Sequence, residues 1–156
     1  MDKTIVTFPD PNLEDVIRKA IDKPEGAIST SDLEHLTTLD APDRGITDLT
    51  GLEYCVNLQK LILYDNNISD ITPLAGLSNL KTLSLYINKI SNTSPLAGLI
   101  NLQELGLSEN NISDISPLAK LTKLEWIDLD GNSVSDFSVL PFEFDQDGAF
   151  ICRIGK

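Results

Sequence analysis

The sequence predicts an α/β repeat solenoid, in which short parallel strands stack into one sheet and a helix covers the amino-terminal end. Three observations predict this fold. Leucines recur every 22 residues, the segments between them align with one another, and an amphipathic helical segment precedes the first of them. A repeat of this length is typical of chains whose units stack on their neighbours to bury a common core.

Each repeat begins at one of the recurring leucines, which are Leu36, Leu58, Leu80, Leu102 and Leu124. Three units align closely: LQKLILYDNNISDITPLAGLSN, LKTLSLYINKISNTSPLAGLIN and LQELGLSENNISDISPLAKLTK. The unit from Leu36 is weaker, and the unit from Leu124 keeps the pattern until Pro141. The shared LxxLxLxxN pattern is the signature of leucine-rich repeats.

The first half of each unit predicts a short strand with one buried face, because apolar residues such as Leu61 and Leu63 alternate with others. An asparagine then ends the strand, at Asn66, Asn88, Asn110 and Asn132. Inside the coil its amide can pair with backbone groups that the turn leaves without partners. Arg44 takes this position in the first unit, so we expect the asparagine contact to be missing there.

The second half of each unit, IxDIxPLxxL, supplies apolar residues that close the coil. Proline fits only the first turn of a helix, so Pro73, Pro95 and Pro117 predict short 3₁₀ or single-turn segments on the convex side. Thr93 replaces the isoleucine of its neighbours, and we expect looser packing there.

The two ends of the repeat array need caps. We expect an amino-terminal helical cap over residues 1–35, about five repeats over 36–140 and a carboxyl-terminal cap over 141–156, all in one structural domain. An apolar helical stripe in the first cap comprises Leu13, Val16, Ile17, Ala20 and Ile21. Asn12 with Asp15 predicts its capping box, and a second helix is expected from Ser31, with Glu34 as capping partner, through Leu36.

Apolar stretches flank Asp147-Gly148 near the carboxyl end, which predicts a β-hairpin covering the last repeat. The alternative is an exposed apolar edge that mediates dimerisation, formed by Phe142, Phe144, Phe150 and Ile154.

The two cysteines, Cys55 and Cys152, are predicted to be free thiols. About four repeats separate them, or roughly 20 Å at about 4.8 Å per strand. A disulfide requires Cα atoms within about 7 Å. Cys55 also takes the place of a repeat leucine, so we expect it to be a buried hydrophobic residue.

The chain is strongly acidic, with 12 Lys and Arg against 24 Asp and Glu and a net charge of -12. This balance disfavours nucleic acid and anionic membranes and favours a basic partner. No apolar run reaches the roughly 18 residues of a membrane span. The start, MDKTIVTFPDPN, lacks the features of an export signal, so we expect no membrane insertion and a soluble chain.

The residue types needed for catalysis are not assembled in the sequence. His35 is the single histidine, which excludes zinc sites built on histidine pairs. The segment from Asp128 to Asn132 resembles a calcium loop but lacks the acidic residue at its twelfth position. No phosphate-binding loop or nucleophile elbow occurs. We therefore expect no enzyme activity, no cofactor and no metal.

Three segments carry a resemblance to a known family. FPDPNLEDVIRKAI, DLEHLTTLDAPDRGITDLTGLEYCVNLQKLIL and NNISDITPLAGLSNL resemble the internalin-like bacterial leucine-rich-repeat proteins, and the resemblance covers residues 8 to about 140. It implies a curved, right-handed solenoid with a concave parallel sheet, used by Gram-positive surface or secreted proteins to bind other proteins. Members often continue into an immunoglobulin-like segment and a cell-wall anchor.

The resemblance implies that a partner binds on the concave face, where strand side chains alternate outwards. The candidate residues are Lys60, Ile62, Tyr64, Asp65, Ser84, Tyr86, Ile87, Glu104, Ser108, Glu109, Trp126, Asp128 and Asp130. Thr38, Asp40, Pro42, Thr82 and Gly106 share this face. Adjoining aromatics within an acidic rim favour a protein partner with a basic patch. The alternatives are a cytoplasmic adaptor or regulator, and a structural or engineered scaffold with no natural ligand.

Overall fold

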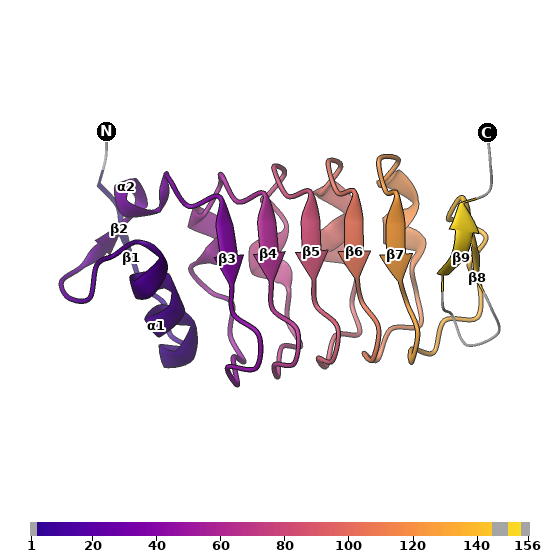
Figure 1. Ribbon diagram of the computed structural model, residues 1–156, viewed down its shortest axis with the longest axis horizontal. Helices are drawn as coiled ribbons and strands as arrows, with labels where there is room; N and C mark the ends of the chain where they lie inside the picture. The colour runs from indigo at the N-terminus through magenta and orange to yellow at the C-terminus, as the bar shows by residue number, and fades with distance from the viewer. Residues whose placement is uncertain (1–2, 145–149, 154–156) are drawn as a thin grey trace.

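The computed structural model describes residues 3–144 and 150–153, and its centre is one parallel five-stranded sheet in the order β3-β4-β5-β6-β7 (Figure 1). Its strands are β3 (Thr38–Asp40), β4 (Lys60–Ile62), β5 (Thr82–Ser84), β6 (Glu104–Gly106) and β7 (Trp126–Asp128). Each residue pairs with the one 22 positions later, as Leu39 does with Leu61 and Leu61 with Leu83. The predicted repeat solenoid and its register are confirmed.

Short 3₁₀ segments form the side opposite the sheet and lie behind the strands in Figure 1. They are η1 (Leu52–Tyr54), η2 (Thr72–Leu74), η3 (Ser94–Gly98) and η4 (Ser116–Lys120). Proline lies in the first turn of the last three, as the sequence predicts. An acidic or amide side chain just before each of these three segments accepts a hydrogen bond from the backbone N–H two residues on. Asp70, for example, accepts one from Thr72 at 2.9 Å.

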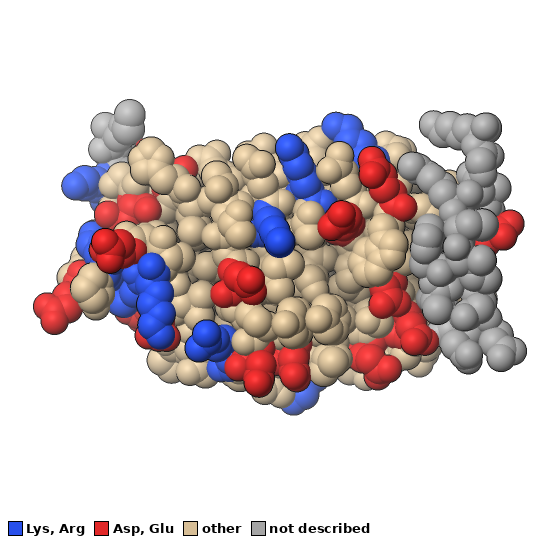
Figure 2. Space-filling model, viewed as in Figure 1, with Lys and Arg blue, Asp and Glu red and all other residues tan. Residues whose placement is uncertain are grey.

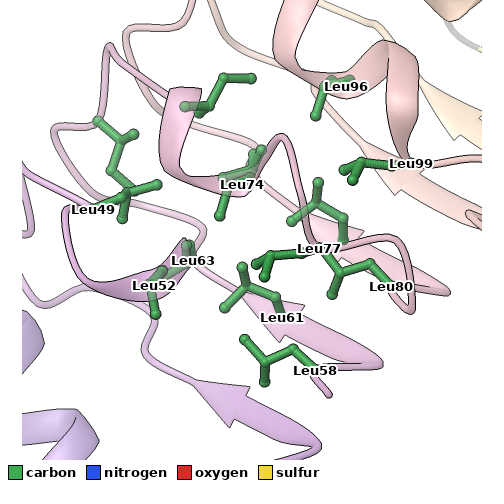
Figure 3. Packing of buried hydrophobic residues seen from close by; sticks show 14 of the residues in the cluster. Leu49, Leu52, Leu58, Leu61, Leu63, Leu74, Leu77, Leu80, Leu96 and Leu99 are labelled. Carbon is green, nitrogen blue, oxygen red and sulfur yellow. The ribbon is translucent and has the colours of Figure 1, made fainter. Parts of the chain in front are cut away.

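The repeat leucines fill the space between the sheet and the 3₁₀ segments, where Leu58, Leu61 and Leu63 are fully buried (Figure 3). Burial of each such side chain contributes about 2 kcal/mol to stability. The looser packing expected at Thr93 stays a prediction, but its polar group has a partner. This side chain is 2% exposed, and its hydroxyl donates to the Asp114 carbonyl at 3.0 Å, which satisfies the polar group that replaces isoleucine.

The predicted asparagines form a ladder inside the coils. The Asn88 amide nitrogen donates to the Leu63 and Leu85 carbonyls, each at 3.0 Å, and its oxygen accepts from the Ile68 N–H at 3.0 Å. Asn66, Asn110 and Asn132 repeat this arrangement. Each amide therefore joins two successive coils. In the first unit Arg44 occupies the asparagine position and is exposed, so no side-chain amide lies inside the coil there, as predicted.

The amino-terminal cap consists of α1 (Pro11–Ala20), α2 (Thr30–Leu33) and an antiparallel pair of short strands, β1 (Ile5–Val6) and β2 (Ile28–Ser29). Leu13, Val16 and Ile17 of the predicted stripe are buried and Ile21 packs against the core, whereas Ala20 is exposed.

Both predicted helix starts are wrong by one or two residues. Asp10, not Asn12, caps α1, because Pro11 has no N–H to satisfy and fits the first turn. Helix α2 begins at Thr30 behind Ser29 and ends at Leu33. The carboxylate of Asp32, not that of Glu34, accepts the Ser29 N–H at 2.7 Å and completes its capping box.

The cap packs tightly against the first repeat at Gly51. Gly51 has φ +103°, and a Cβ atom there would lie 2.5 Å from the ring of Phe8, which is buried. Glycine is the residue type that adopts this backbone conformation without strain. The repeat pattern does not indicate this contact, because Phe8 lies outside the repeats and Gly51 stands where the next three units have proline.

Replacing Gly51 with alanine is expected to lower the free energy of unfolding by about 2 kcal/mol, since the new methyl group meets Phe8 and the backbone is strained. Denaturant unfolding of the Gly51→Ala variant measures this loss. Gly76→Ala is the control, because a Cβ atom at Gly76 would meet nothing within 4 Å. Equal stabilities of the two variants would contradict the assignment.

At the carboxyl end, β8 (Phe142–Phe144) and β9 (Phe150–Arg153) pair antiparallel, as the hairpin prediction requires. The Asp147-Gly148 turn lies outside the described residues. Phe142 is buried, so its assignment to an exposed dimerisation edge is wrong. The other residues of that proposed edge, Phe144, Phe150 and Ile154, lie outside the described side chains.

Candidate functional site

The candidate site is the outward face of the five-stranded sheet, which Figure 2 shows toward the viewer. Successive side chains of a strand point to opposite faces of the sheet, so Leu61 is buried in the core while Lys60 is exposed and Ile62 is half-buried. Of the predicted residues, Lys60, Asp65, Ile87, Glu104, Glu109 and Trp126 are exposed. Ile62, Tyr64, Ser84, Tyr86, Ser108, Asp128 and Asp130 are half-buried. The strands thus bring the predicted residues to one accessible face.

Two tyrosines stack on each other at the centre of this face. Tyr64 follows β4 and Tyr86 follows β5, and their ring centroids are 4.5 Å apart with 6° between the ring planes. Such pairs contribute about 1 kcal/mol beyond the area that they bury. Burial, the negative charges that Tyr64 and Asp65 can carry, and a side-chain hydrogen bond with Tyr64 that favours the protonated phenol raise the pKa of Tyr86, so its phenol is neutral near pH 7.

Gly106 provides space beside the tyrosine pair, and the sequence analysis did not recognise this role. It lies on β6 opposite Ser84 in the sheet register, and it is buried rather than outward and accessible. A Cβ atom there would lie 3.7 Å from both Tyr86 Cδ1 and Ser84 Oγ. Both distances are ordinary van der Waals contacts, so the Tyr86 ring lies directly beside Gly106. The signal was a glycine between two strand leucines, where the other units have larger residues.

A corner with left-handed backbone ends each strand, one residue before each ladder position. It comprises Asp43, Asp65, Ile87, Glu109 and Gly131, whose φ angles lie between +50° and +68°. We name these residues the corner column. Aspartate and glycine tolerate this conformation, whereas a β-branched residue such as Ile87 does not adopt it readily.

Acidic side chains predominate over β6 and β7, whereas lysines share the face nearer β4 and β5 (Figure 2). Asp128 accepts a hydrogen bond from the Asp130 N–H at 3.1 Å, and Asp130 accepts one from the Gly131 N–H at 2.9 Å. These carboxylates therefore shape the turn after β7. Within residues 3–144 and 150–153, no group of three or more acidic, histidine or cysteine side chains could hold a metal ion.

The arrangement also offers no activated nucleophile at Cys55. This cysteine is free and fully buried, and burial, with the nearby charge of Glu53, raises the pKa of its thiol to about 12. A nucleophilic cysteine requires a thiolate, which burial disfavours. His35 is exposed. The side chain of Cys152 lies outside the described part of the chain.

A groove extends the sheet face toward the amino-terminal cap. It encloses about 280 Å³ between α1 and β3, and its walls include Val16, Lys19, Asp40 and Arg44. The cap and the sheet thus form one continuous surface. Among the described residues, no helix is long and apolar enough to cross a membrane.

Comparisons with known proteins support this architecture. The family of leucine-rich repeats in two copies matches residues 56–98 and 100–141. No curated protein sequence matches significantly. The solved structure of an internalin, InlF from Listeria monocytogenes, is 32% identical with a TM-score of 0.75, and the match covers 85% of this chain and 46% of that one.

Two further solved structures share the fold. A leucine-rich-repeat protein of Leptospira interrogans is 28% identical with a TM-score of 0.63 over 67% of this chain and 28% of its own. The functional domain of Listeria monocytogenes InlJ is 23% identical with a TM-score of 0.66, over 88% of this chain and 41% of its own. This chain thus spans less than half of each of the three solved chains. It belongs to the leucine-rich-repeat family and is an internalin-like bacterial member of it.

Proposed function

We propose that this chain is a non-catalytic interaction module that binds a protein partner on the outward face of its sheet. The observation that carries the proposal is the stacked pair of Tyr64 and Tyr86, with Trp126 43% exposed two strands further along. Aromatic side chains held on a rigid sheet are the residue type that dominates protein interfaces. The similarity to internalins supports an interaction role over a catalytic one.

The charge of the face favours a partner with a basic patch. Asp65 and Glu109 are exposed beside the tyrosine pair, and Glu104 pairs with Trp126 in the sheet register. The net charge of -12 adds a long-range attraction for cations and repels nucleic acid. We further propose that the chain acts at a bacterial surface or after secretion, as its similarity to internalins suggests.

The test is a capture experiment with host-cell surface extract and with bacterial lysate. The parent is compared with a Tyr64→Ala, Tyr86→Ala, Trp126→Ala variant that remains folded by circular dichroism. We expect the parent alone to retain the partner, since loss of one dominant interface residue weakens binding about 30-fold. The source of the captured protein also tests the proposed location.

The matched control is Tyr54→Ala, which removes a more accessible tyrosine, 40% exposed, from η1 on the opposite side of the sheet. This variant should capture the same protein as the parent. Equal capture by parent and triple variant, or no capture by either, would contradict the proposed site.

A further inference from the structure

Ile87 differs from the rest of the corner column. Its φ angle is +55°, and its side chain is β-branched and apolar, whereas the other corner residues are acidic or glycine. In the left-handed conformation a β-branched side chain crowds its own backbone, which raises the free energy of the folded state. Ile87 therefore lowers the stability of its own corner.

Backbone hydrogen bonds to the neighbouring coils hold residue 87 in this conformation but do not require isoleucine. The Ile87 N–H donates to the Ser108 carbonyl at 3.0 Å, and its carbonyl accepts from the Asn66 N–H at 3.2 Å. The side chain is 45% exposed, so it adds little to the core. Asp65 occupies the same corner one coil earlier, and its N–H donates to the Tyr86 carbonyl. The folded structure alone thus gives no reason for an apolar, branched residue here.

We propose that Ile87 is a specificity-determining contact for a protein partner, retained at the expense of stability. This inference rests on the proposed function and names the chemistry of the partner: an apolar contact flanked on each side by Lys or Arg. Asp65 and Glu109 occupy the corners of the coils before and after Ile87, and both are exposed. Their carboxylates complement basic side chains on either side of the apolar one.

The spacing of the corner column fits a helical partner segment. Successive coils are about 4.8 Å apart. Residues three or four apart on a helix place their side chains about 5 to 6 Å apart on one face, whereas same-face residues of an extended strand are about 7 Å apart. The inferred partner segment is therefore a helix with an apolar residue and a basic residue one turn away on each side.

The first measurement is thermal unfolding of the Ile87→Asn variant. Asparagine tolerates the left-handed conformation, so we expect Tm to rise by about 2 to 4 °C. Ile100→Asn is the matched control. Ile100 is 53% exposed and is not among the described residues with positive φ, so its replacement should leave Tm unchanged. An unchanged or lower Tm for Ile87→Asn would overturn the strain argument.

The second measurement uses a display library of helical, alanine-rich peptides with randomised exposed positions. Selection on the parent should enrich an apolar residue with Lys or Arg one turn away on each side. The selected peptides should bind Ile87→Asn at least about tenfold more weakly, as expected for loss of an apolar anchor, and should bind Ile87→Val and Ile100→Asn like the parent.

The outcomes separate this inference from the proposed function. Selected peptides that bind Ile87→Asn as well as the parent, but not the Tyr64, Tyr86 and Trp126 triple variant, would overturn the role of Ile87 and leave the sheet face in place. Enrichment of acidic peptides would overturn the inferred partner chemistry. Failure to enrich any peptide that distinguishes the parent from the triple variant would count against both proposals.

Discussion

Replacing Asp10 with alanine is expected to lower the free energy of unfolding by about 4 kcal/mol, since it removes both a helix cap and a link between the cap and the repeats. One carboxylate oxygen accepts the Asn12 and Leu13 N–H groups at 2.9 and 3.1 Å. The other accepts the Thr47 and Asp48 N–H groups at 2.7 and 3.1 Å. Denaturant unfolding followed by circular dichroism measures the loss.

The effect of Asp10 should also depend on pH. Burial raises the pKa of Asp10, but hydrogen bonds from the four backbone N–H groups outweigh burial and hold it below its ordinary value of 3.8. The stability gained from the charged form is therefore present above about pH 3.8 and is lost as pH falls through the lower folded pKa. The stability difference between the parent and Asp10→Asn should accordingly shrink below that pH.

Asp15→Asn is the control for the Asp10 variants. Asp15 lies on the same helix, but it is exposed and pairs with Lys19, and exposed ion pairs contribute little. A loss of under about 0.5 kcal/mol is expected there. If Asp10→Ala were no less stable than Asp15→Asn, Asp10 would not hold the cap to the repeats.

Replacing Asn88 with alanine is expected to have an effect of similar size, about 4 kcal/mol. The variant leaves the Ile68 N–H unpaired inside the coil. It also removes one of two amide bonds from each of the Leu63 and Leu85 carbonyls, which keep those from Asn66 and Asn110. A buried polar group left unpaired costs about 1 to 3 kcal/mol, and each lost hydrogen bond costs about 1 kcal/mol more. Hydrogen exchange should show faster exchange of the Ile68 amide, and chemical denaturation should show the global loss.

Asn79→Ala tests whether the ladder position matters rather than the loss of any asparagine. Asn79 belongs to a second, exposed row and donates to the Val56 carbonyl at 2.9 Å. Water can replace its bond, so a loss below about 1 kcal/mol is expected. Comparable losses for Asn88→Ala and Asn79→Ala would show that burial of the ladder amides does not govern stability.

The repeat pattern predicted most of the solenoid because each unit meets nearly the same surroundings. Alternating leucines such as Leu61 and Leu63 can be buried only in a strand, and the proline after each aspartate or asparagine limits the opposite side to 3₁₀ turns. The spacing also placed Tyr64 and Tyr86 directly after adjacent strands, which is why the aromatic centre of the candidate site could be anticipated.

The sequence by itself thus determined the repeat architecture, the buried leucines and the side chains of the outward face, since these follow from local periodicity. Only the tertiary structure decided the interactions that depend on geometry across coils. Asp10 bridges to Thr47, Phe8 covers Gly51, and Ile87 takes a left-handed backbone. The physical reason is that these bonds, contacts and φ angles depend on how the cap packs and how the chain turns after each strand, and the spacing of the leucines specifies neither.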